Sequence, residues 1–559
     1  MVQRILKFFN HEFGNIHKAA IVLAFSSIGS GLLALFRDRL LAGHFGAGKT
    51  LDIYYTAFRI PDFLYVFMLS VTSVAVIIPF FLERMSVSKE KTQAFFNGVF
   101  SLFILSNFAL IIILFLFAPF LIRLMAPGFS VSDQNQLTNA TRILLFSPFL
   151  LGLSNLFSSV IQSYKKFFIY ALSPILYNLG IIFGILFFSY DLGLKGVIFG
   201  VILGATMHLL IQVPEIIRLG FMPRFSFNIN FSEIKEIVKF SLPRTLGLGL
   251  NQFVFVFIIG TASLLAAGSI AVFTFSYNIQ YVVLGVVGFS YSVAAFPTLT
   301  KFFVKNQKKE FLDLVISASR HIIFWTLPAI ALFVVLRAQI VRVILGSGEF
   351  SWSDTRLTAA GLALFAISLT AQSLNVLFVR SFYAAGKTMK PLIINIFSSV
   401  FIIISSYVLI KIFNVYEPMK IFFESVLRVK DVPGTSVLML PLAFSLGMII
   451  NAVLLWKSFQ KEFNHVGTFL KKTLWQSLAS ALLIGVVAYF GLSVFDDVFN
   501  LETFIGIFLQ GLFSGLIAIL SGCILLKFLN NQELNDVISS LKQKFWKTDT
   551  VIPEHEDLS

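Results

Sequence analysis

The chain has 559 residues, of which 57% are hydrophobic and 13% charged, and its mean hydropathy is +0.87. Soluble proteins usually carry about 45–50% apolar and about 25% charged residues, so this composition excludes a soluble multidomain enzyme and indicates a polytopic membrane protein. The net charge of +15 does not point to nucleic acid, because the basic residues lie between apolar stretches. The single cysteine, Cys523, allows no intramolecular disulfide and no cysteine-based metal site, and we expect neither a metal nor a cofactor.

Fourteen apolar stretches are long enough to cross a bilayer as helices, which takes about 20 residues each. Their hydrophobicity is continuous rather than alternating, which favours helices over the strands of a membrane barrel. We therefore predict an all-α polytopic membrane protein with about 14 transmembrane helices. The stretches are centred near residues 30, 69, 106, 150, 178, 206, 250, 285, 325, 368, 401, 447, 482 and 515.

The distribution of lysine and arginine predicts the orientation in the membrane. With the N-terminus in the cytoplasm, 27 of the 43 basic residues fall in cytoplasmic segments and 12 in outside loops. This asymmetry follows the positive-inside rule, so we expect both termini to be cytoplasmic. The longest loop, 411–436, then lies outside, where we favour a simple connector over a short amphipathic helix on the outer leaflet.

An internal repeat divides the chain. Pro174 is followed four residues later by Asn178, and Pro391 by Asn395, at an offset of 217 residues. The motif APGF near residue 128 has a counterpart, GSGEF, near residue 348. Repeated halves around a central site are a common plan of transporters, although chance likeness between apolar segments is the alternative. The repeat predicts two six-helix lobes, two additional transmembrane helices and a cytoplasmic polar tail, with the bounds 1–220, 221–458, 459–529 and 530–559.

Ionisable residues within spans mark candidate functional sites, because each costs about 2.5–3.5 kcal/mol at a helix centre. The densest group comes early: Arg37 and Asp38 close the first span, Asp52 opens the next, and Arg59 follows within it. Asp52 and Arg59 are seven residues apart and share a helical face, and Pro61 would free backbone carbonyls nearby. We predict that this group lines a polar cavity with a cationic side, suited to a phosphate or carboxylate.

Two further arginines bear on this prediction. A simpler alternative is that Arg37 and Arg39 snorkel to the outer interface and pair with Asp38. Arg244, which follows Pro243 in the seventh span, is the analogous charge of the second half. We include it among the candidate substrate-binding residues.

Two glycine patterns need separate interpretations. The segment from Gly43 to Thr50, GHFGAGKT, matches the phosphate-binding pattern G-x-x-x-x-G-K-[ST]. A functional loop of this kind follows a β-strand, whereas this one follows a membrane helix and would lie outside the cell, so we attribute the match to chance and expect no ATP. The series Gly196, Gly200 and Gly204 has the spacing of helix packing.

A long N-terminal segment, residues 35–64, has the sequence LFRDRLLAGHFGAGKTLDIYYTAFRIPDFL. It resembles the N-terminal signature of the MurJ/MviN lipid II flippase family. The later segments APGF, GFMPRFSF, GSGEF and RSFYAAGKTMKP resemble motifs of that family in the same order. The resemblance runs over about residues 1–460, and the two extra C-terminal spans match in number and place.

The resemblance implies the fold of the multidrug/oligosaccharidyl-lipid/polysaccharide exporter superfamily, with two six-helix lobes around a cationic cavity and a groove for the lipid tail on the last two helices. It implies a transporter, not an enzyme. Its activity would be to flip the undecaprenyl-pyrophosphate-linked peptidoglycan precursor, for cell-wall biogenesis, from the inner to the outer leaflet of the bacterial cytoplasmic membrane by alternating access. The implied partners are that precursor and the lipid bilayer, and we expect a monomer.

The resemblance also assigns individual residues. Arg37 matches the cavity arginine of the family's Arg-Asp pair, Asp52 matches the aspartate after FGAG, and Arg59 matches the basic residue of AF[RK]-x-P. Asp38 and Arg244 complete the candidate substrate-binding set. The chain departs from the family at four positions where a charge is expected, namely Gly31, Tyr65, Asn278 and Tyr281.

These departures leave other functions open. One alternative is a flippase or exporter of another polyprenyl-linked saccharide or of a small molecule, and a second is a non-transporting scaffold of cell-envelope synthesis. A third alternative is a membrane enzyme such as a lipid-sugar transferase, which would need an acidic pair in an early outside loop. The pair Asp496-Asp497 lies near the C-terminal end of the chain instead, which argues against this alternative.

Overall fold

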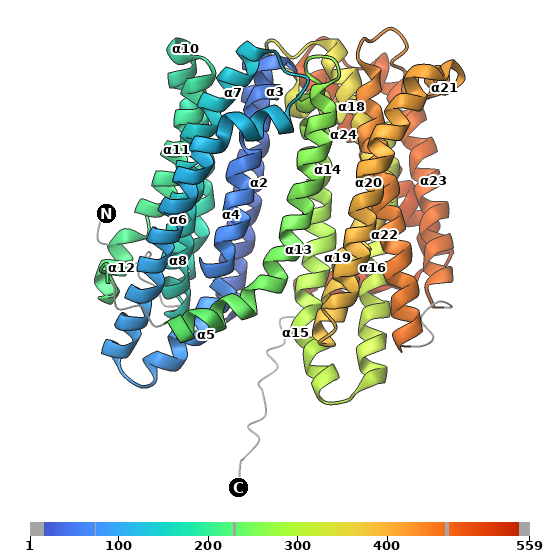
Figure 1. Ribbon diagram of the computed structural model, residues 1–559. Helices are drawn as coiled ribbons and strands as arrows, with labels where there is room; N and C mark the ends of the chain where they lie inside the picture. The colour runs from blue at the N-terminus through green and yellow to red at the C-terminus, as the bar shows by residue number, and fades with distance from the viewer. Residues whose placement is uncertain (1–15, 73, 227–230, 464–468, 547–559) are drawn as a thin grey trace, which may run out of the picture. The chain divides into compact units, whose positions relative to one another are not determined.

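The computed structural model describes the backbone of residues 16–72, 74–226, 231–463 and 469–546 (Figure 1). Every regular element in these ranges is helical, which confirms the predicted all-α membrane protein. Ten helices are long and apolar enough to cross a membrane. The number is eleven if α18 (Trp352–Ala366) and α19 (Leu369–Ala384) form one broken span.

The predicted positions of the spans agree with these helices. Thirteen of the fourteen predicted centres fall inside a helix, and the other, near residue 368, falls at the break between α18 and α19. The count of fourteen is not itself confirmed. Within the described residues, the seventh predicted span contains a shorter apolar helix, Gly249–Ser263.

The helices form two compact units, each described here by itself. The first unit comprises the described parts of Met1–Val282, Val341–Phe365 and Thr388–Asn451. Its elements are α2 (Ile16–Phe45), α3 (Lys49–Ala57), α4 (Arg59–Thr72), α5 (Val74–Met85), α6 (Lys89–Met125), α7 (Val131–Leu144), α8 (Phe146–Ser163), α9 (Phe167–Phe183), η1 (Gly184–Phe188), α10 (Ser189–Leu192), α11 (Leu194–Leu210), α12 (Val213–Leu219), α13 (Phe231–Ser263), α14 (Ser269–Val283), α18, α20 (Met389–Val415), α21 (Glu417–Leu427) and η3 (Thr435–Leu438).

The second unit comprises the described parts of Val283–Ile340, Ala366–Lys387 and Ala452–Ser559. Its elements are η2 (Leu284–Phe289), α15 (Ser290–Val304), α16 (Lys308–Val335), α19, α23 (Phe469–Asp496), α24 (Phe504–Phe528) and α25 (Gln532–Trp546). Two helices are divided between the units, α17 (Arg337–Leu345) and α22 (Met439–Phe463), and α14 and α18 each have their last residue in the second unit. The predicted division into lobes at 1–220 and 221–458 stays a prediction.

Short polar side chains set the beginnings of several helices. Ser88 accepts a hydrogen bond from the backbone of Lys91 and starts α6, which is 37 residues long. Ser130 and Asp133 form a reciprocal capping box at the start of α7. These caps satisfy backbone N–H groups that have no partner within the helix, so each long helix begins at a defined residue.

Glycines allow α9 and the π-helical turn η1 to approach α11 closely. A Cβ atom on Gly180 would lie 2.3 Å from the Cα of Gly204, and one on Gly184 would lie 2.4 Å from the Cα of Gly200. Because no side chain larger than hydrogen fits, the backbones themselves are in contact. The predicted packing role of this glycine series is confirmed.

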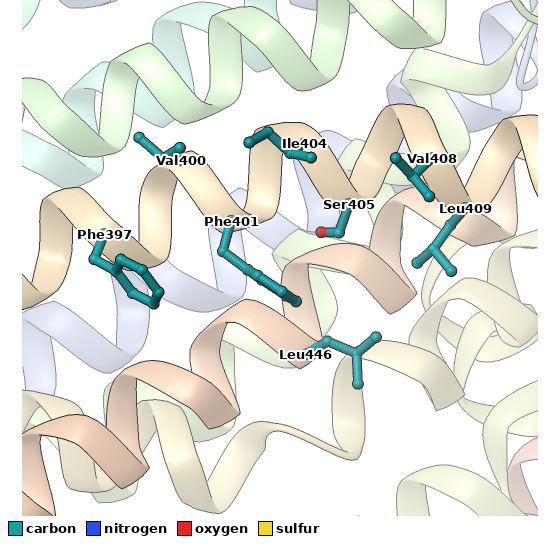
Figure 2. Close-up of a pocket in the computed structure, with 8 residues that line it drawn as sticks. All are labelled: Phe397, Val400, Phe401, Ile404, Ser405, Val408, Leu409 and Leu446. Carbon is teal, nitrogen blue, oxygen red and sulfur yellow. The ribbon is translucent and has the colours of Figure 1, made fainter.

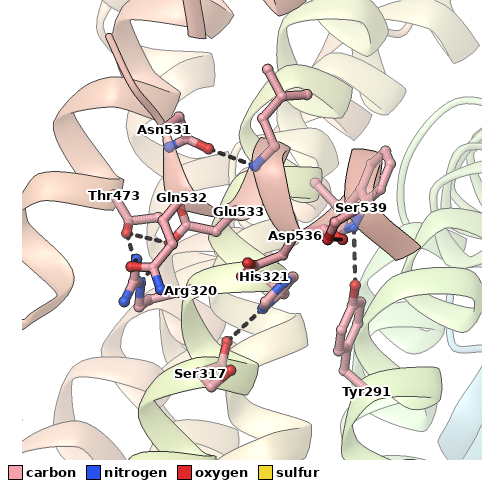
Figure 3. A network of polar contacts seen from close by, with 12 residues as sticks. Tyr291, Ser317, Arg320, His321, Thr473, Asn531, Gln532, Glu533, Asp536 and Ser539 are labelled. Carbon is pink, nitrogen blue, oxygen red and sulfur yellow. Dashed lines mark hydrogen bonds and ion pairs between the residues drawn. The ribbon is translucent and has the colours of Figure 1, made fainter. Parts of the chain in front are cut away.

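The polar tail contains a helix, as predicted, and this helix is docked within the second unit. Glu533 of α25 accepts hydrogen bonds from Arg320 of α16 at 2.5 Å and from Thr473 of α23 at 2.8 Å (Figure 3). Leu534 packs with Phe324 and Leu526 in a small apolar cluster. The α25 helix therefore ties together the ends of α16, α23 and α24. Residues 547–559 of the predicted tail lie outside the described part of the chain.

Candidate functional site

The charged group singled out in the sequence is centred on Arg37 and Asp38 in α2. The Arg37 guanidinium donates to one carboxylate oxygen of Asp38 through Nε at 3.0 Å and through Nη2 at 2.8 Å. The Asp38 side chain is 3% exposed, whereas 20% of the Arg37 side chain is accessible. A buried carboxylate thus holds an arginine that keeps an accessible face, and this arrangement suits the binding of an anion.

Two asparagines from other helices complete the surroundings of this pair. Asn178 of α9 accepts a hydrogen bond from Arg37 Nη1 at 3.2 Å, and Asn278 of α14 donates to the second carboxylate oxygen of Asp38 at 3.0 Å. Asn178 also donates to the hydroxyl of Ser30 at 3.2 Å. Helices α2, α9 and α14 therefore meet at one polar centre, in which both oxygens of the buried carboxylate have a donor.

Arg59 is the first residue of α4, and Phe58 separates this helix from α3. Its Nε donates to the carbonyl of Tyr55 at 3.2 Å, and its Nη1 lies 3.9 Å from the carboxylate of Asp62. The guanidinium carbon lies 5.6 Å from the ring centre of Phe255 in α13, which is a cation–π distance. Arg59 is thus oriented by its own helix and by an aromatic ring, with 12% of its side chain exposed.

Asp52 has a different environment from the other predicted site residues. Its buried carboxylate accepts hydrogen bonds from the backbone N–H groups of Gly268 at 2.7 Å and Ala271 at 2.9 Å. These groups belong to the first turn of α14, where backbone donors lack partners within the helix. Asp52 therefore caps α14 from a distant part of the chain, and its negative charge interacts favourably with the positive end of the α14 dipole.

Arg39 also bonds to backbone. Its guanidinium donates to the carbonyls of Val343 at 2.7 Å and Gly346 at 3.1 Å. This contact joins α2 to the GSGEF motif, so Arg39 holds a loop in place beside the Arg37–Asp38 pair. The simpler alternative is that Arg37 and Arg39 pair with Asp38; Arg37 does form this pair, whereas these bonds take Arg39 to backbone carbonyls.

Three close contacts of glycines lie where the Gly43–Thr50 segment, APGF and GSGEF meet their neighbours. A Cβ atom on Gly348 would lie 2.2 Å from the carbonyl oxygen of Gly43, one on Gly268 would lie 1.9 Å from that of Ala47, and one on Gly128 would lie 2.0 Å from that of Ser263. We call these contacts the glycine seam. Gly268 and Gly348 also have positive φ angles of 89° and 50°. Glycine is therefore required there both for the close contact and for the backbone conformation. The seam lies at the upper end of the first unit in Figure 1, where α2 passes into α3.

The segment from Gly43 to Thr50 is part of this seam. It follows the helix α2 rather than a strand, and it continues into α3. Its lysine, Lys49, forms an ion pair with Asp133 at 3.2 Å and lies 4.6 Å from the ring centre of Phe129. The glycines and the lysine that match the phosphate-binding pattern thus have structural contacts.

At the four departures from the family pattern, neutral groups stand where charges were expected. Asn278 bonds to Asp38, and the hydroxyl of Tyr65 accepts a hydrogen bond from Asn155 at 2.9 Å. Tyr281 is 43% exposed, and a Cβ on Gly31 would meet no heavy atom within 4 Å. The backbone of Arg244 is part of α13, but its side chain lies outside the described residues, so its predicted role stays a prediction.

Tyrosines surround the charged group. Tyr54 and Tyr55 of α3 are 3% and 6% exposed and contact each other edge to face, and the Tyr55 carbonyl accepts the hydrogen bond from Arg59. The Tyr55 hydroxyl is buried and has no hydrogen-bond partner among the described residues. A buried hydroxyl without a partner is costly, and it leaves a donor available close to the arginines.

An apolar groove of about 380 Å³ lies along α20 in the same unit (Figure 2). Seven of its eight lining residues are hydrophobic, and the exception is Ser405, whose hydroxyl donates to the carbonyl of Ile402. The groove thus offers hydrocarbon surface and no charged partner for a head group. Within the described residues, no three potential metal ligands gather in one place.

The sequence model of one protein family, described as the lipid II flippase MurJ, matches residues 41–417. The chain belongs to the MurJ lipid II flippase family. Two curated relatives, both named "Probable lipid II flippase MurJ", illustrate the similarity. The protein of Buchnera aphidicola subsp. Schizaphis graminum is 28% identical over 391 residues, which cover 68% of this chain and 75% of the relative. The protein of Rickettsia prowazekii is 27% identical over 387 residues, which cover 68% and 76%.

Solved structures give the same fold. A MurJ structure described as the inward closed conformation superposes with a TM-score of 0.73 at 22% identity and covers 93% of this chain and 100% of its own. An inward-facing multidrug transporter of the MATE family has a TM-score of 0.64 at 17% identity, with 80% and 98% covered. The MurJ fold, expected from the sequence motifs, is confirmed, and the multidrug transporter shares it.

Several members of the site were missed at the sequence level. Asn178 was noticed only as part of the repeat, and its bonds to Arg37 and Ser30 were not foreseen. Asn278 was treated as a lost charge, although it is a direct partner of Asp38. The position of an asparagine four residues after a proline inside a span was the available signal, because buried amides need partners.

Proposed function

We propose that this protein is a lipid II flippase, which carries the undecaprenyl-pyrophosphate-linked peptidoglycan precursor from the inner to the outer leaflet of the bacterial inner membrane. Family membership supports the activity, and the observation that carries the site is the accessible face of Arg37 above the buried Asp38. The protein acts as a transporter and not as an enzyme. It works as a monomer without ATP.

Arg37 is suited to the pyrophosphate for a geometric reason. A guanidinium has five N–H donors, and three of those of Arg37 are used by Asp38 and Asn178. The remaining two can bind phosphate oxygens, while Asp38 fixes the plane of the guanidinium beforehand. Arg59, whose Nε bonds to the carbonyl of Tyr55, would contribute a second charge, and the unpartnered Tyr55 hydroxyl would contribute a neutral donor.

The glycine seam is the contact that opens when the protein changes from an inward-facing to an outward-facing state. We place the seam at the outer side of the membrane, because the distribution of basic residues puts both termini in the cytoplasm. Closed as it is here, the seam blocks that side. Release outside then requires the Asp52 cap and the Arg39 contacts to separate, so both residues control access rather than bind the substrate. The isoprenoid tail stays in lipid along α23 and α24.

The test is complementation in cells depleted of their own lipid II flippase, with survival and lipid II on the outer leaflet as the measurements. The wild-type chain should rescue, and Arg37→Ala should not, because the pyrophosphate then has no donor in the polar centre. Arg142→Ala is the matched control, since Arg142 bonds to the carbonyl of Phe115 away from this centre.

The outcomes separate the alternatives. Rescue by Arg37→Ala equal to that of the wild type would remove Arg37 from the site. Failure of the wild-type chain despite normal expression would favour another polyprenyl-linked substrate or a scaffold role, for which the neutral residues Asn278 and Tyr281 already give a reason.

A further inference from the structure

The short helix α21 is held rigidly against the first unit. Arg356 of α18 donates to both carboxylate oxygens of Asp431, at 2.7 and 2.6 Å, and to the carbonyl of Arg428. The hydroxyl of Thr435 donates to the buried Glu424 at 2.6 Å. The guanidinium of Arg356 lowers the pKa of Asp431 through this hydrogen bond, so the clamp is ionised at neutral pH. The orientation of α21 is therefore fixed.

With this orientation, α21 exposes an apolar stripe. Glu424 and Leu427 face inward and are buried, whereas Phe422 and Val426 are each 59% exposed. Phe422 and Val426 are four residues apart and share one face of the helix, and Met419 lies one turn earlier on the same side. Two large hydrophobic side chains so exposed on a fixed helix indicate a surface that is covered in the working protein.

The position of α21 along the chain decides what covers it. The helix begins at Glu417, two residues after α20 ends at Val415, and α20 is a membrane-spanning candidate of 27 residues. At 1.5 Å per residue α20 is about 40 Å long, compared with a hydrocarbon core of about 30 Å. The end of α20, and with it the start of α21, therefore lies at the depth of the lipid head groups.

The residues around the stripe fit this depth. Tyr416, which joins the two helices, is 57% exposed, and aromatic side chains gather at the membrane–water interface. Lys420 and Arg428 flank the stripe, and long basic side chains can reach anionic head groups from there. From this geometry we propose that α21 lies in the plane of one leaflet, with Phe422 and Val426 inserted at the boundary between head groups and acyl chains. Its partner is the lipid surface.

The single cysteine makes this proposal directly testable. In a Cys523→Ser background, a nitroxide label is attached to Phe422→Cys, to Val426→Cys or, as the control, to Glu417→Cys. Glu417 is exposed and lies about 140° around the helix from Phe422. The full-length proteins are reconstituted into phosphatidylethanolamine–phosphatidylglycerol liposomes. Power-saturation spectroscopy then compares the accessibility of each label to oxygen, which concentrates in lipid, and to a water-soluble nickel chelate.

We expect the ratio of oxygen to nickel accessibility to be several-fold higher at 422 and 426 than at 417. A high nickel accessibility at 422 and 426 would place the stripe in water and overturn the proposal. Exclusion of both reagents there would also overturn it, because a second copy or another protein would then cover the stripe. Asp431→Ala adds a second readout: loss of the clamp should broaden the range of depths at 422 and leave the label in the liposome bilayer.

Discussion

Two arginine–carboxylate pairs in this protein have nearly the same burial and very different settings. In the first unit, Arg37 and Asp38 are 20% and 3% exposed, and in the second, Arg320 and Glu533 are 23% and 1% exposed. Arg37 and Asp38 are neighbours on one helix. Arg320 and Glu533 are 213 positions apart and join α16 to α25 (Figure 3).

This difference separates a binding role from a structural one. The Arg37–Asp38 pair forms within one helix, with Asn178 of α9 and Asn278 of α14 as further partners, and its arginine remains accessible to a ligand. The pair across two helices closes a long loop, and its arginine also bonds to Thr473 and Gln532. Burial and residue type alone thus do not distinguish the two roles. The sequence separation of the partners does.

The largest expected effect tests the first pair. Arg37→Ala should lower lipid II flipping at least about 30-fold, because losing a charged contact to a buried phosphate costs 2 kcal/mol or more, at about 1.4 kcal/mol per tenfold. Because the variant also leaves Asp38 buried without its arginine, we expect some loss of stability, so flipping is measured per folded molecule. A large drop in the unfolding temperature with unchanged flipping per folded molecule would mean that Arg37 has a structural role rather than a binding role.

The second pair should respond in the opposite way. Arg320→Ala leaves Glu533 buried without its main partner, and we expect a loss of about 3 kcal/mol in the free energy of unfolding. Flipping per folded molecule should stay close to the wild-type value. The measurement is denaturant unfolding in detergent, with Lys301→Ala on the exposed part of α15 as a control. Unchanged stability would contradict the structural assignment.

The glycine seam should be less sensitive in stability than the Arg320–Glu533 pair but should change conformation. Gly268→Ala places a Cβ against the Ala47 carbonyl and strains a positive φ angle, at a cost of about 2 kcal/mol. Because the strain acts on the closed seam, cysteines placed at Ala47 and Ser269 should become more accessible to a water-soluble thiol reagent. Gly31→Ala, with no neighbour within 4 Å, is the matched control and should have no effect. Equal reactivity in both variants would argue against gating at the seam.

A smaller effect is expected from the neutral partner of Asp38. Asn278→Ala removes one donor from the carboxylate, which costs about 1 kcal/mol and should lower flipping about fivefold through a less ordered Arg37. Asn278→Ser keeps a hydrogen-bonding group and should retain more activity. Wild-type flipping by Asn278→Ala would mean that Asp38 needs no second donor.

The smallest effect at neutral pH concerns Glu533. Burial raises the pKa of Glu533. The hydrogen bonds from its own backbone N–H, Thr473 and Arg320 lower this pKa by more than burial raises it, so the pKa lies below the ordinary value. A lowered pKa in the folded state means that the stabilisation is complete above the ordinary glutamate pKa, about 4.3, and is lost as the pH falls below it. The stability of Glu533→Gln should therefore depend less on pH between about 5 and 3 than that of the wild type.

The sequence predicted the fold class, the spans and the family with good accuracy, because these depend on local hydrophobicity and on ordered motifs. It also placed Arg37 and Asp38 together, since they are adjacent in the chain. It gave Asp52 a substrate-binding role, whereas the structure places its carboxylate on the backbone of Gly268 and Ala271, more than 200 residues away. Contacts of such separation leave no pattern in one sequence, and for the same reason the partner of Glu533 could not be named.

The two asparagines of the predicted repeat have different partners in the structure. Asn178, four residues after Pro174, bonds to Ser30 and to the charged Arg37. Asn395, in the same place after Pro391, accepts a hydrogen bond from the neutral Asn451 at 2.9 Å. The asparagine of the first segment thus has a charged partner, and the asparagine of the second segment has a neutral partner. The first segment therefore offers a charged group beside its asparagine, whereas the second offers a neutral one.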